Sequence, residues 1–216
     1  MENILIAGAT GSTGKRIIEI LNNSESFSPM AMIRKEEQRQ IFEDMGVESI
    51  LADLEEDVSH AFKGVDKVIF AAGSGGSTGP EKTTAIDQEG AIKMIDGAKA
   101  SGVKKFVMLS SMGTDSPEDG GDLEHYLRAK KKADDHLRAS GMPFTIVQPG
   151  SLNDEMGRAR VKVAEKLEEY GEISRDDVAF LLVMSLADPL TKNMSYQAVE
   201  GETPVKQALI ELSGIG

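Results

Sequence analysis

An apolar segment near the first residue leads directly into a glycine-rich turn. Residues 4–7 are apolar without interruption, which is typical of a strand buried on both faces of a parallel sheet. Glycines stand at positions 8, 11 and 14, and apolar residues from Ile17 onward begin a helix. Glycine permits a sharp turn and lets a diphosphate approach the backbone, while the helix N-terminus offers N–H groups and a positive dipole end. The pattern therefore predicts a nucleotide-binding turn formed by Gly8, Thr10, Gly11, Ser12, Thr13 and Gly14.

Two other interpretations of this turn are weaker. A glycine-rich turn without a ligand is possible, but the strand before it and the helix after it favour binding. A P-loop needs a glycine five positions before Gly14, where Ala9 stands, and Ser or Thr after Lys15, where Arg16 stands. The P-loop pattern thus fails at both positions.

Composition excludes several classes of function. The 216 residues suffice for one sizeable α/β domain, and a net charge of −12 disfavours nucleic acid or an anionic membrane as partner. The run 130–132 is the only basic cluster and is followed by Asp134 and Asp135, so it is interpreted as a solvated helix face. There is no cysteine, and the three histidines lack metal-ligand spacing, so no metal site is expected. No segment resembles a membrane span and the first strand begins at once, so we expect a cytoplasmic protein.

Apolar strand-like segments alternate with helix-like segments along most of the chain. Strands are predicted at residues 4–7, 30–33, 47–51, 68–72, 106–109 and 144–147. One helix is predicted to begin at Ile17, and others at 38–45, 58–62, 83–100 and 122–139. Gly46, Gly64, Gly102 and Gly141 each stand where a helix ends before a new strand. This alternation predicts an α/β fold with a doubly wound parallel sheet, the Rossmann type, whose ligand lies at the carboxyl ends of the strands.

The last third of the chain is less regular. Weaker patterns indicate strands at 160–163 and 195–199 and helices at 176–187 and 204–212. Residues 150–216 are too few for an ordinary independent domain. We therefore expect one domain over residues 1–216, with 150–216 forming a small cap on the substrate side.

Three kinds of side chain point to proton transfer. Tyr126 and Lys130 lie four residues apart on one face of a helix, where an ammonium lowers the pKa of a neighbouring phenol. A tyrosine so placed can protonate a carbonyl that receives hydride. Ser110 and Ser111 end the fifth strand and are candidates to bind the substrate oxygen. A tyrosine packed at the core edge and serines that only cap a strand are the alternatives.

Other candidate cofactor contacts follow from the fold. Arg34 stands twenty residues after Gly14, where NAD-binding domains place a carboxylate that grips the ribose 2′-hydroxyl. An arginine there favours the 2′-phosphate of NADP, so the expected cofactor is NADPH rather than NADH. The remaining expected contacts end the third, fourth and sixth strands or come from the helix lysine: Asp53 and Leu54; Ala71, Ala72 and Gly73; Pro149, Gly150, Ser151 and Leu152; and Lys130.

The motifs together resemble a known family. The turn 8–14, the segments 71–73 and 102–111, the Tyr126/Lys130 pair and Pro149-Gly150 are similar to the atypical short-chain dehydrogenase/reductases, in the branch of flavin and biliverdin reductase-like proteins and NmrA-like sensors. The resemblance covers nearly the whole chain. Relatives commonly carry Arg where this chain has Gln148 and often Asn where it has Asp87.

The resemblance implies a reductase that passes hydride from NADPH to a small carbonyl, quinone or flavin-like acceptor. Tyr126 would supply the proton, Lys130 would lower its pKa and hold the nicotinamide ribose, and Ser110 or Ser111 would bind the oxygen; in the flavin-reductase-like relatives solvent can supply the proton. A non-catalytic NADP(H) sensor of the NmrA-like type is the alternative. A nucleotide-sugar epimerase is a third, which the short C-terminal region disfavours.

Overall fold

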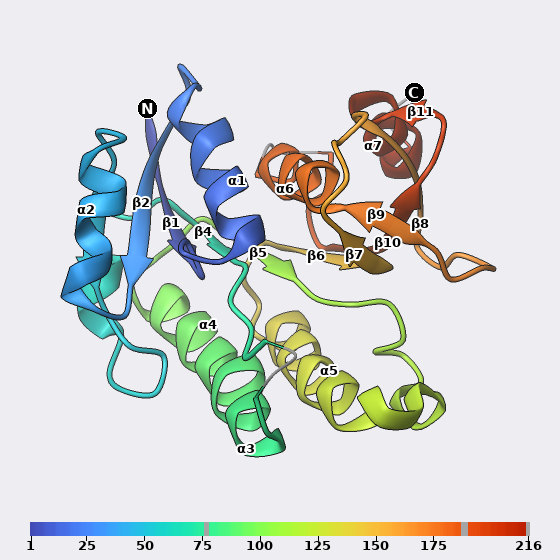
Figure 1. Cartoon of the computed structure of the whole chain (residues 1–216), viewed down its shortest axis with the longest axis horizontal. Helices are drawn as coiled ribbons and strands as arrows, with labels where there is room; N and C mark the ends of the chain where they lie inside the picture. Colours follow the sequence, from blue (N-terminus) through green and yellow to red (C-terminus); the bar gives the residue numbers. More distant parts are fainter. Residues whose placement is uncertain (76–77, 187–189, 215–216) are drawn as a thin grey trace.

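The computed structural model describes residues 1–75, 78–186 and 190–214. Its main feature is a nine-stranded sheet in the order β11-β8-β10-β6-β5-β4-β1-β2-β3 (Figure 1). The strands are β1 (Glu2–Ala7), β2 (Phe27–Ile33), β3 (Glu48–Leu51), β4 (Lys67–Phe70), β5 (Lys105–Leu109), β6 (Phe144–Pro149), β8 (Arg160–Ala164), β10 (Met194–Glu200) and β11 (Thr203–Pro204). From β3 to β10 all pairings are parallel, while β8 pairs antiparallel with β10 and β11 pairs antiparallel with β8. The predicted doubly wound Rossmann fold is confirmed.

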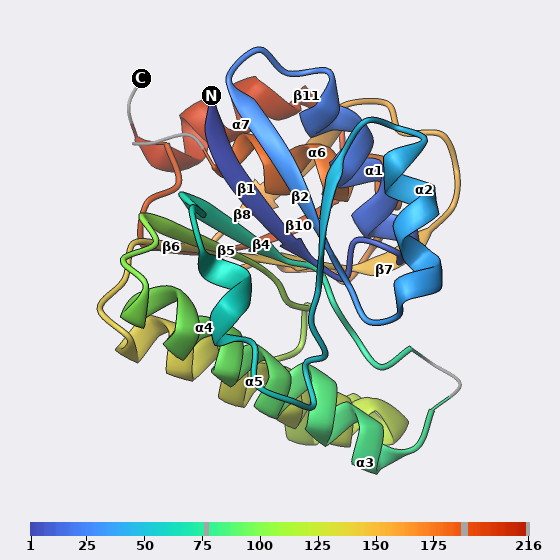
Figure 2. The same cartoon turned by 90° about the vertical axis from the view of Figure 1, so that its left-hand side faces the viewer.

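Helices cover both faces of the sheet (Figures 1 and 2). Alternation along β1 sends Ile4 and Ile6 to one core, and Leu5 and Ala7 to the other. The first core is covered by α1 (Ser12–Asn22), α6 (Arg175–Met184), α7 (Val205–Ser213) and the short α2 (Arg39–Glu43). The second core is covered by α4 (Ala91–Ala100) and α5 (Glu124–Ala139). This two-sided burial explains why the central strands are continuously apolar in sequence.

The predicted element boundaries hold best where glycine ends a helix or turn. Gly46, Gly64, Gly102 and Gly141 all have left-handed backbone, with φ between 69° and 77°. The helix expected at 83–100 is instead three consecutive segments: α3 (Pro80–Thr83), a π-helical turn (Thr84–Gly90) and α4. The expected helix at 58–62 is a 3-10 turn over Ser59–Phe62, and another 3-10 segment, Pro117–Leu123, precedes α5.

Residues beyond Pro149 continue the main sheet. β10 pairs in parallel with β6, and β8 then pairs with β10. A separate two-stranded sheet, β7 (Ser151–Asn153) with β9 (Glu172–Ser174), was not foreseen. The predicted end of the sixth helix at residue 187 lies outside the described residues. No helix in the described part of the chain is long and apolar enough to cross a membrane.

Candidate dinucleotide site

The three glycines of the first turn meet different surroundings. Gly8 has φ +84°, and a Cβ added to it would lie 2.6 Å from the Ala72 nitrogen. A Cβ on Gly14 would lie only 2.0 Å from the Gly8 carbonyl oxygen, because α1 begins directly against the turn. At Gly11 the nearest atom would be 3.3 Å away and the remaining space is open. Gly8 and Gly14 therefore permit the turn to form, whereas Gly11 leaves room for a ligand.

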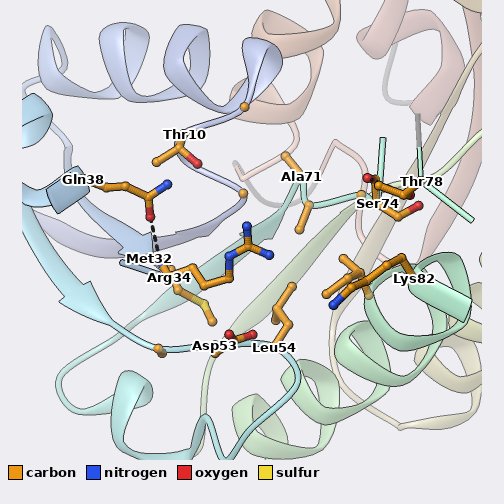
Figure 3. A pocket seen from close by; sticks show the side chains of 16 residues that line it. Thr10, Met32, Arg34, Gln38, Asp53, Leu54, Ala71, Ser74, Thr78 and Lys82 are labelled. Atoms are coloured by element: carbon orange, nitrogen blue, oxygen red, sulfur yellow. Dashed lines mark hydrogen bonds between the residues drawn. The ribbon is translucent and has the colours of Figure 1, made fainter. Parts of the chain in front are cut away.

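A cavity of about 470 Å³ opens beside this turn, at the carboxyl ends of β1, β2 and β4 and beside the segment after β3 (Figure 3). We call it the dinucleotide cavity. Its walls are formed by Gly8, Thr10, Gly11, Met32, Arg34, Gln38, Ala52, Asp53, Leu54, Ala71, Ala72, Gly73, Ser74, Thr78, Lys82 and Ile86. Small side chains and backbone at the turn and after β4 allow close approach of a flat or extended ligand.

The Arg34 guanidinium reaches into this cavity, between Thr10 and Leu54 (Figure 3). Its backbone is fixed because the Arg34 N–H donates to Gln38 Oε1 at 2.9 Å. Its guanidinium makes no hydrogen bond or ion pair with the described residues, so its donors are free for a ligand. Lys82 lines the same cavity but is paired with Glu55.

Asp53 also lines this cavity while it stabilises its own loop. Its Oδ1 accepts the Glu55 N–H at 3.0 Å, as in an Asx turn. Its other carboxylate oxygen has no hydrogen bond within the described residues. The loop contact and the expected contact to the cofactor are therefore compatible.

A second cavity, of about 500 Å³, shares Ser74 and Thr78 with the dinucleotide cavity and is lined by Tyr126. Lys130 follows Tyr126 by one helical turn on α5, and its Nζ lies 5.8 Å from the centre of the tyrosine ring. Burial raises the pKa of Tyr126 above its ordinary value, and the Lys130 charge offsets only part of that effect. The expectation that Lys130 leaves Tyr126 with a lowered pKa is therefore wrong, because desolvation of the phenolate outweighs the ammonium.

Lys130 is buried rather than open to a ligand. Its Nζ lies 3.2 Å from Asp87 Oδ1 and donates to the Leu109 carbonyl at 3.1 Å. Asp87 is fully buried in the π-helical turn, and its Oδ2 accepts the Ser74 N–H at 2.9 Å. Lys130 is thus tied through Asp87 to the loop after β4, and in this arrangement it lines none of the cavities described here, contrary to the expected contact with the nicotinamide ribose.

The two serines after β5 have different surroundings. Ser110 is buried, and its Oγ donates to Asp134 Oδ2 at 2.7 Å, so it does not face a cavity. Gln148 Nε2 donates to Thr114 Oγ1 at 2.7 Å and reaches the same Asp134 oxygen at 3.3 Å. Burial raises the pKa of Asp134 to about 6. Ser111 instead lines a third cavity. Lys130 and Asp134 are buried, which corrects the interpretation of this stretch as a wholly solvated face.

The segment after β6 contributes less than expected. Gly150 is pressed against Gly171, whose carbonyl oxygen would lie 2.0 Å from an added Cβ. The Pro149 carbonyl oxygen accepts a hydrogen bond from the Met112 N–H at 2.9 Å, and Leu152 packs against the first core. Among the cavities described here, Ser151 lines the third one, and the other three of residues 149–152 line none. The described residues hold no group of acidic or histidine side chains able to bind a metal ion.

Comparison with known proteins agrees with this geometry. Residues 8–189 match the family model described as NAD(P)H-binding. The chain belongs to this NAD(P)H-binding family. It is 42% identical to the protein named uncharacterized sugar epimerase YhfK of Bacillus subtilis, over 97% of this chain and 99% of that one.

Two solved structures support the same assignment. A Bacillus halodurans protein with the provisional name NAD-dependent epimerase/dehydratase is 39% identical, with a TM-score of 0.94, over 98% of this chain and 100% of that one. The oxidoreductase ylbE of Lactococcus lactis is 27% identical, with a TM-score of 0.87, over 97% and 96%. The resemblance to NAD(P)-binding, reductase-like Rossmann proteins is thereby confirmed.

Within this NAD(P)H-binding fold, most of the predicted cofactor contacts gather in one place. The predicted residues that line the dinucleotide cavity are Gly8, Thr10, Gly11, Arg34, Asp53, Leu54, Ala71, Ala72 and Gly73. Ser12 lines a neighbouring cavity at the start of α1, while Thr13 and Gly14 are packed inside the turn. The other seven lining residues, among them Gln38 and Lys82, were not predicted from the sequence. Gln38 stands four residues after Arg34, which is a local signal, but Lys82 is brought in only by the fold.

Proposed function

We propose that this protein is an NADP(H)-dependent oxidoreductase that reduces a small carbonyl, quinone or flavin-like acceptor. The observation that carries the proposal is the unpaired Arg34 guanidinium inside the dinucleotide cavity. When bound, NADPH supplies hydride. Arg34 would bind the 2′-phosphate, which NADH lacks, by charge-assisted hydrogen bonds.

Residues around the second cavity supply the proton that the reduced acceptor takes up. The raised pKa keeps Tyr126 protonated at neutral pH. A phenol is still more acidic than an alcohol, so a developing alkoxide can take the proton from Tyr126. A flavin-like acceptor can take its proton from water, in which case Tyr126 only shapes the cavity. The ion pair between Lys130 and Asp87 fixes the position of the loop that contains Ser74, and Ser74 lines the dinucleotide cavity.

The names of two relatives support an epimerase as a second candidate. An epimerase returns its hydride to the substrate from which it came, so no NADPH is consumed over the cycle. Net consumption of NADPH therefore separates the two reactions. A sensor would bind NADPH and consume none with any acceptor or sugar nucleotide.

Two measurements test the proposal: the affinity for each cofactor and the rate of NADPH oxidation. We expect NADPH to bind ten- to a hundredfold more tightly than NADH, since a charge-assisted hydrogen bond contributes roughly 1.5–3 kcal/mol. Arg34→Ala should remove this preference and leave NADH affinity nearly unchanged, with Lys35→Ala as the control. Equal affinities for both cofactors in the wild type would contradict the NADPH preference.

The second measurement follows NADPH oxidation with quinones, flavins and aldehydes. On a carbonyl acceptor, Tyr126→Phe should lower kcat about a hundredfold or more without changing cofactor affinity. Tight NADPH binding without oxidation by any acceptor would favour the sensor instead.

A further inference from the structure

The third cavity, of about 480 Å³, lies at the carboxyl ends of β5 and β6, where Ser111 and Ser151 line it. It shares Leu123 with the second cavity, which in turn shares Ser74 and Thr78 with the dinucleotide cavity. The three cavities therefore follow one another along the same edge of the sheet. A dinucleotide bound at Arg34 would extend along this edge, which would leave the third cavity for the acceptor.

Five of the residues that line this third cavity, which we call the acceptor cavity, have large apolar side chains. Leu123 and Tyr170, which are 57% and 60% exposed, both line it. They are two of only six large apolar side chains that are exposed in the described part of the chain. Buried Leu127 and Leu167 lie behind them. Two exposed apolar side chains at one cavity favour a ligand with apolar surface, and the Tyr170 ring offers a face on which a flat ring can stack.

The rim of the acceptor cavity carries more negative than positive charge. Asp115 and Asp119 line it from the segment before α5, and both are exposed. Lys166 is the single cation in its lining. An anionic substituent on a ligand here meets two carboxylates and one ammonium, within a chain whose net charge is −12. Such a substituent is disfavoured, whereas a neutral or cationic ring is accepted.

We propose that the acceptor cavity takes a planar aromatic acceptor that is neutral or positively charged, and discriminates against acceptors that carry an anionic substituent. This inference rests on the proposed reductase function. The acceptor gains a hydride from NADPH and one proton from Tyr126 or water, and is thereby reduced by two electrons while NADPH becomes NADP⁺.

Riboflavin and flavin mononucleotide test the charge preference, because they share one redox-active ring and differ by a phosphate. With NADPH as donor, we expect kcat/KM for riboflavin to exceed that for the mononucleotide by about three- to tenfold at low salt, and the ratio to fall as salt is added. Asp115→Asn combined with Asp119→Asn should bring the ratio close to one. Glu118→Gln, an exposed acid of the same segment that does not line the cavity, should leave it unchanged.

A binding measurement separates failure of this inference from failure of the proposed function. Affinity of both flavins for the protein saturated with NADP⁺ is measured by fluorescence quenching, which needs no turnover. The same preference for riboflavin, lost in the double aspartate variant, supports the inference even without catalysis. Equal affinities, no flavin binding, or a ratio that Glu118→Gln changes as much as the double variant would overturn it, while NADPH binding would still stand.

Discussion

At the residue scale, the first turn shows that one glycine motif serves two purposes. A side chain at Gly14 would meet the Gly8 carbonyl oxygen at 2.0 Å, whereas at Gly11 the nearest contact is 3.3 Å. The sequence treats both positions alike as cofactor contacts. The structure assigns Gly14 to the packing of α1 against the turn and leaves Gly11 beside the cavity.

The two glycines should therefore respond differently to substitution. Gly11→Val is expected to keep the wild-type melting temperature and to weaken NADPH binding at least about a hundredfold, or about 2.7 kcal/mol. Gly14→Ala should lower the free energy of unfolding by roughly 1–3 kcal/mol, because backbone must move to admit the methyl group. Calorimetric titration and thermal unfolding measure the two effects. A Gly11→Val variant with undiminished NADPH affinity would refute the placement of the diphosphate.

At the element scale, α5 presents a buried polar face to the sheet. Tyr126, Lys130 and Asp134 follow one another at intervals of four residues, so they lie on one side of the helix. The Tyr126/Lys130 spacing was recognised in the sequence. The burial of Asp134 was not, because a basic run followed by two aspartates is typical of a solvated face. Only the contacts to Ser110 and Gln148 reveal its environment.

The Asp134 carboxyl makes stability depend on pH. Burial raises its pKa in the folded protein to about 6 from an ordinary value of 3.8, so the folded state holds this proton more tightly than the unfolded state. Its contribution is fully present below pH 3.8 and is lost as pH rises through 6.

Relative to wild type, Asp134→Asn should therefore gain roughly 2–2.5 kcal/mol of unfolding free energy between pH 4 and 7. Urea unfolding at several pH values measures this difference. Asp135→Asn changes an exposed neighbour paired with Lys131 and Arg138, and should show no such trend. If the difference in unfolding free energy between Asp134→Asn and wild type does not change with pH, the Asp134 carboxyl of the wild type has an ordinary pKa.

At the scale of the whole molecule, one arginine joins the first helix to the C-terminal region. Arg16 on α1 binds Asp176 on α6 and lies 3.4 Å from Asp154. Asp176 also accepts the Gly157 N–H at 3.0 Å, so the loop over residues 154–159 is held from both sides. Arg16 therefore connects α1, the helix that follows the cofactor turn, to the proposed C-terminal cap.

Loss of this link should loosen the loop and leave the sheet intact. We expect Arg16→Ala to speed amide hydrogen exchange in residues 154–159 about fivefold, equivalent to about 1 kcal/mol, with no change in β1 or β4. Arg128→Ala, which removes an exposed pair with Glu124 on α5, is the matched control. Unchanged exchange in the loop would show that Asp177, which accepts the Arg158 and Ala159 N–H groups, holds it alone.

The sequence by itself determined the parallel sheet, the glycine turn and the position of Arg34. These depend on local geometry: apolar runs buried on two faces, glycines in left-handed backbone, and a fixed count along one βαβ unit. The tertiary structure alone decided that Ser110 faces Asp134, that Asp87 holds Lys130, and that Lys82 enters the cavity. Each of these contacts joins residues from different elements, so its geometry is set by helix-to-sheet packing, which no spacing within a single element encodes.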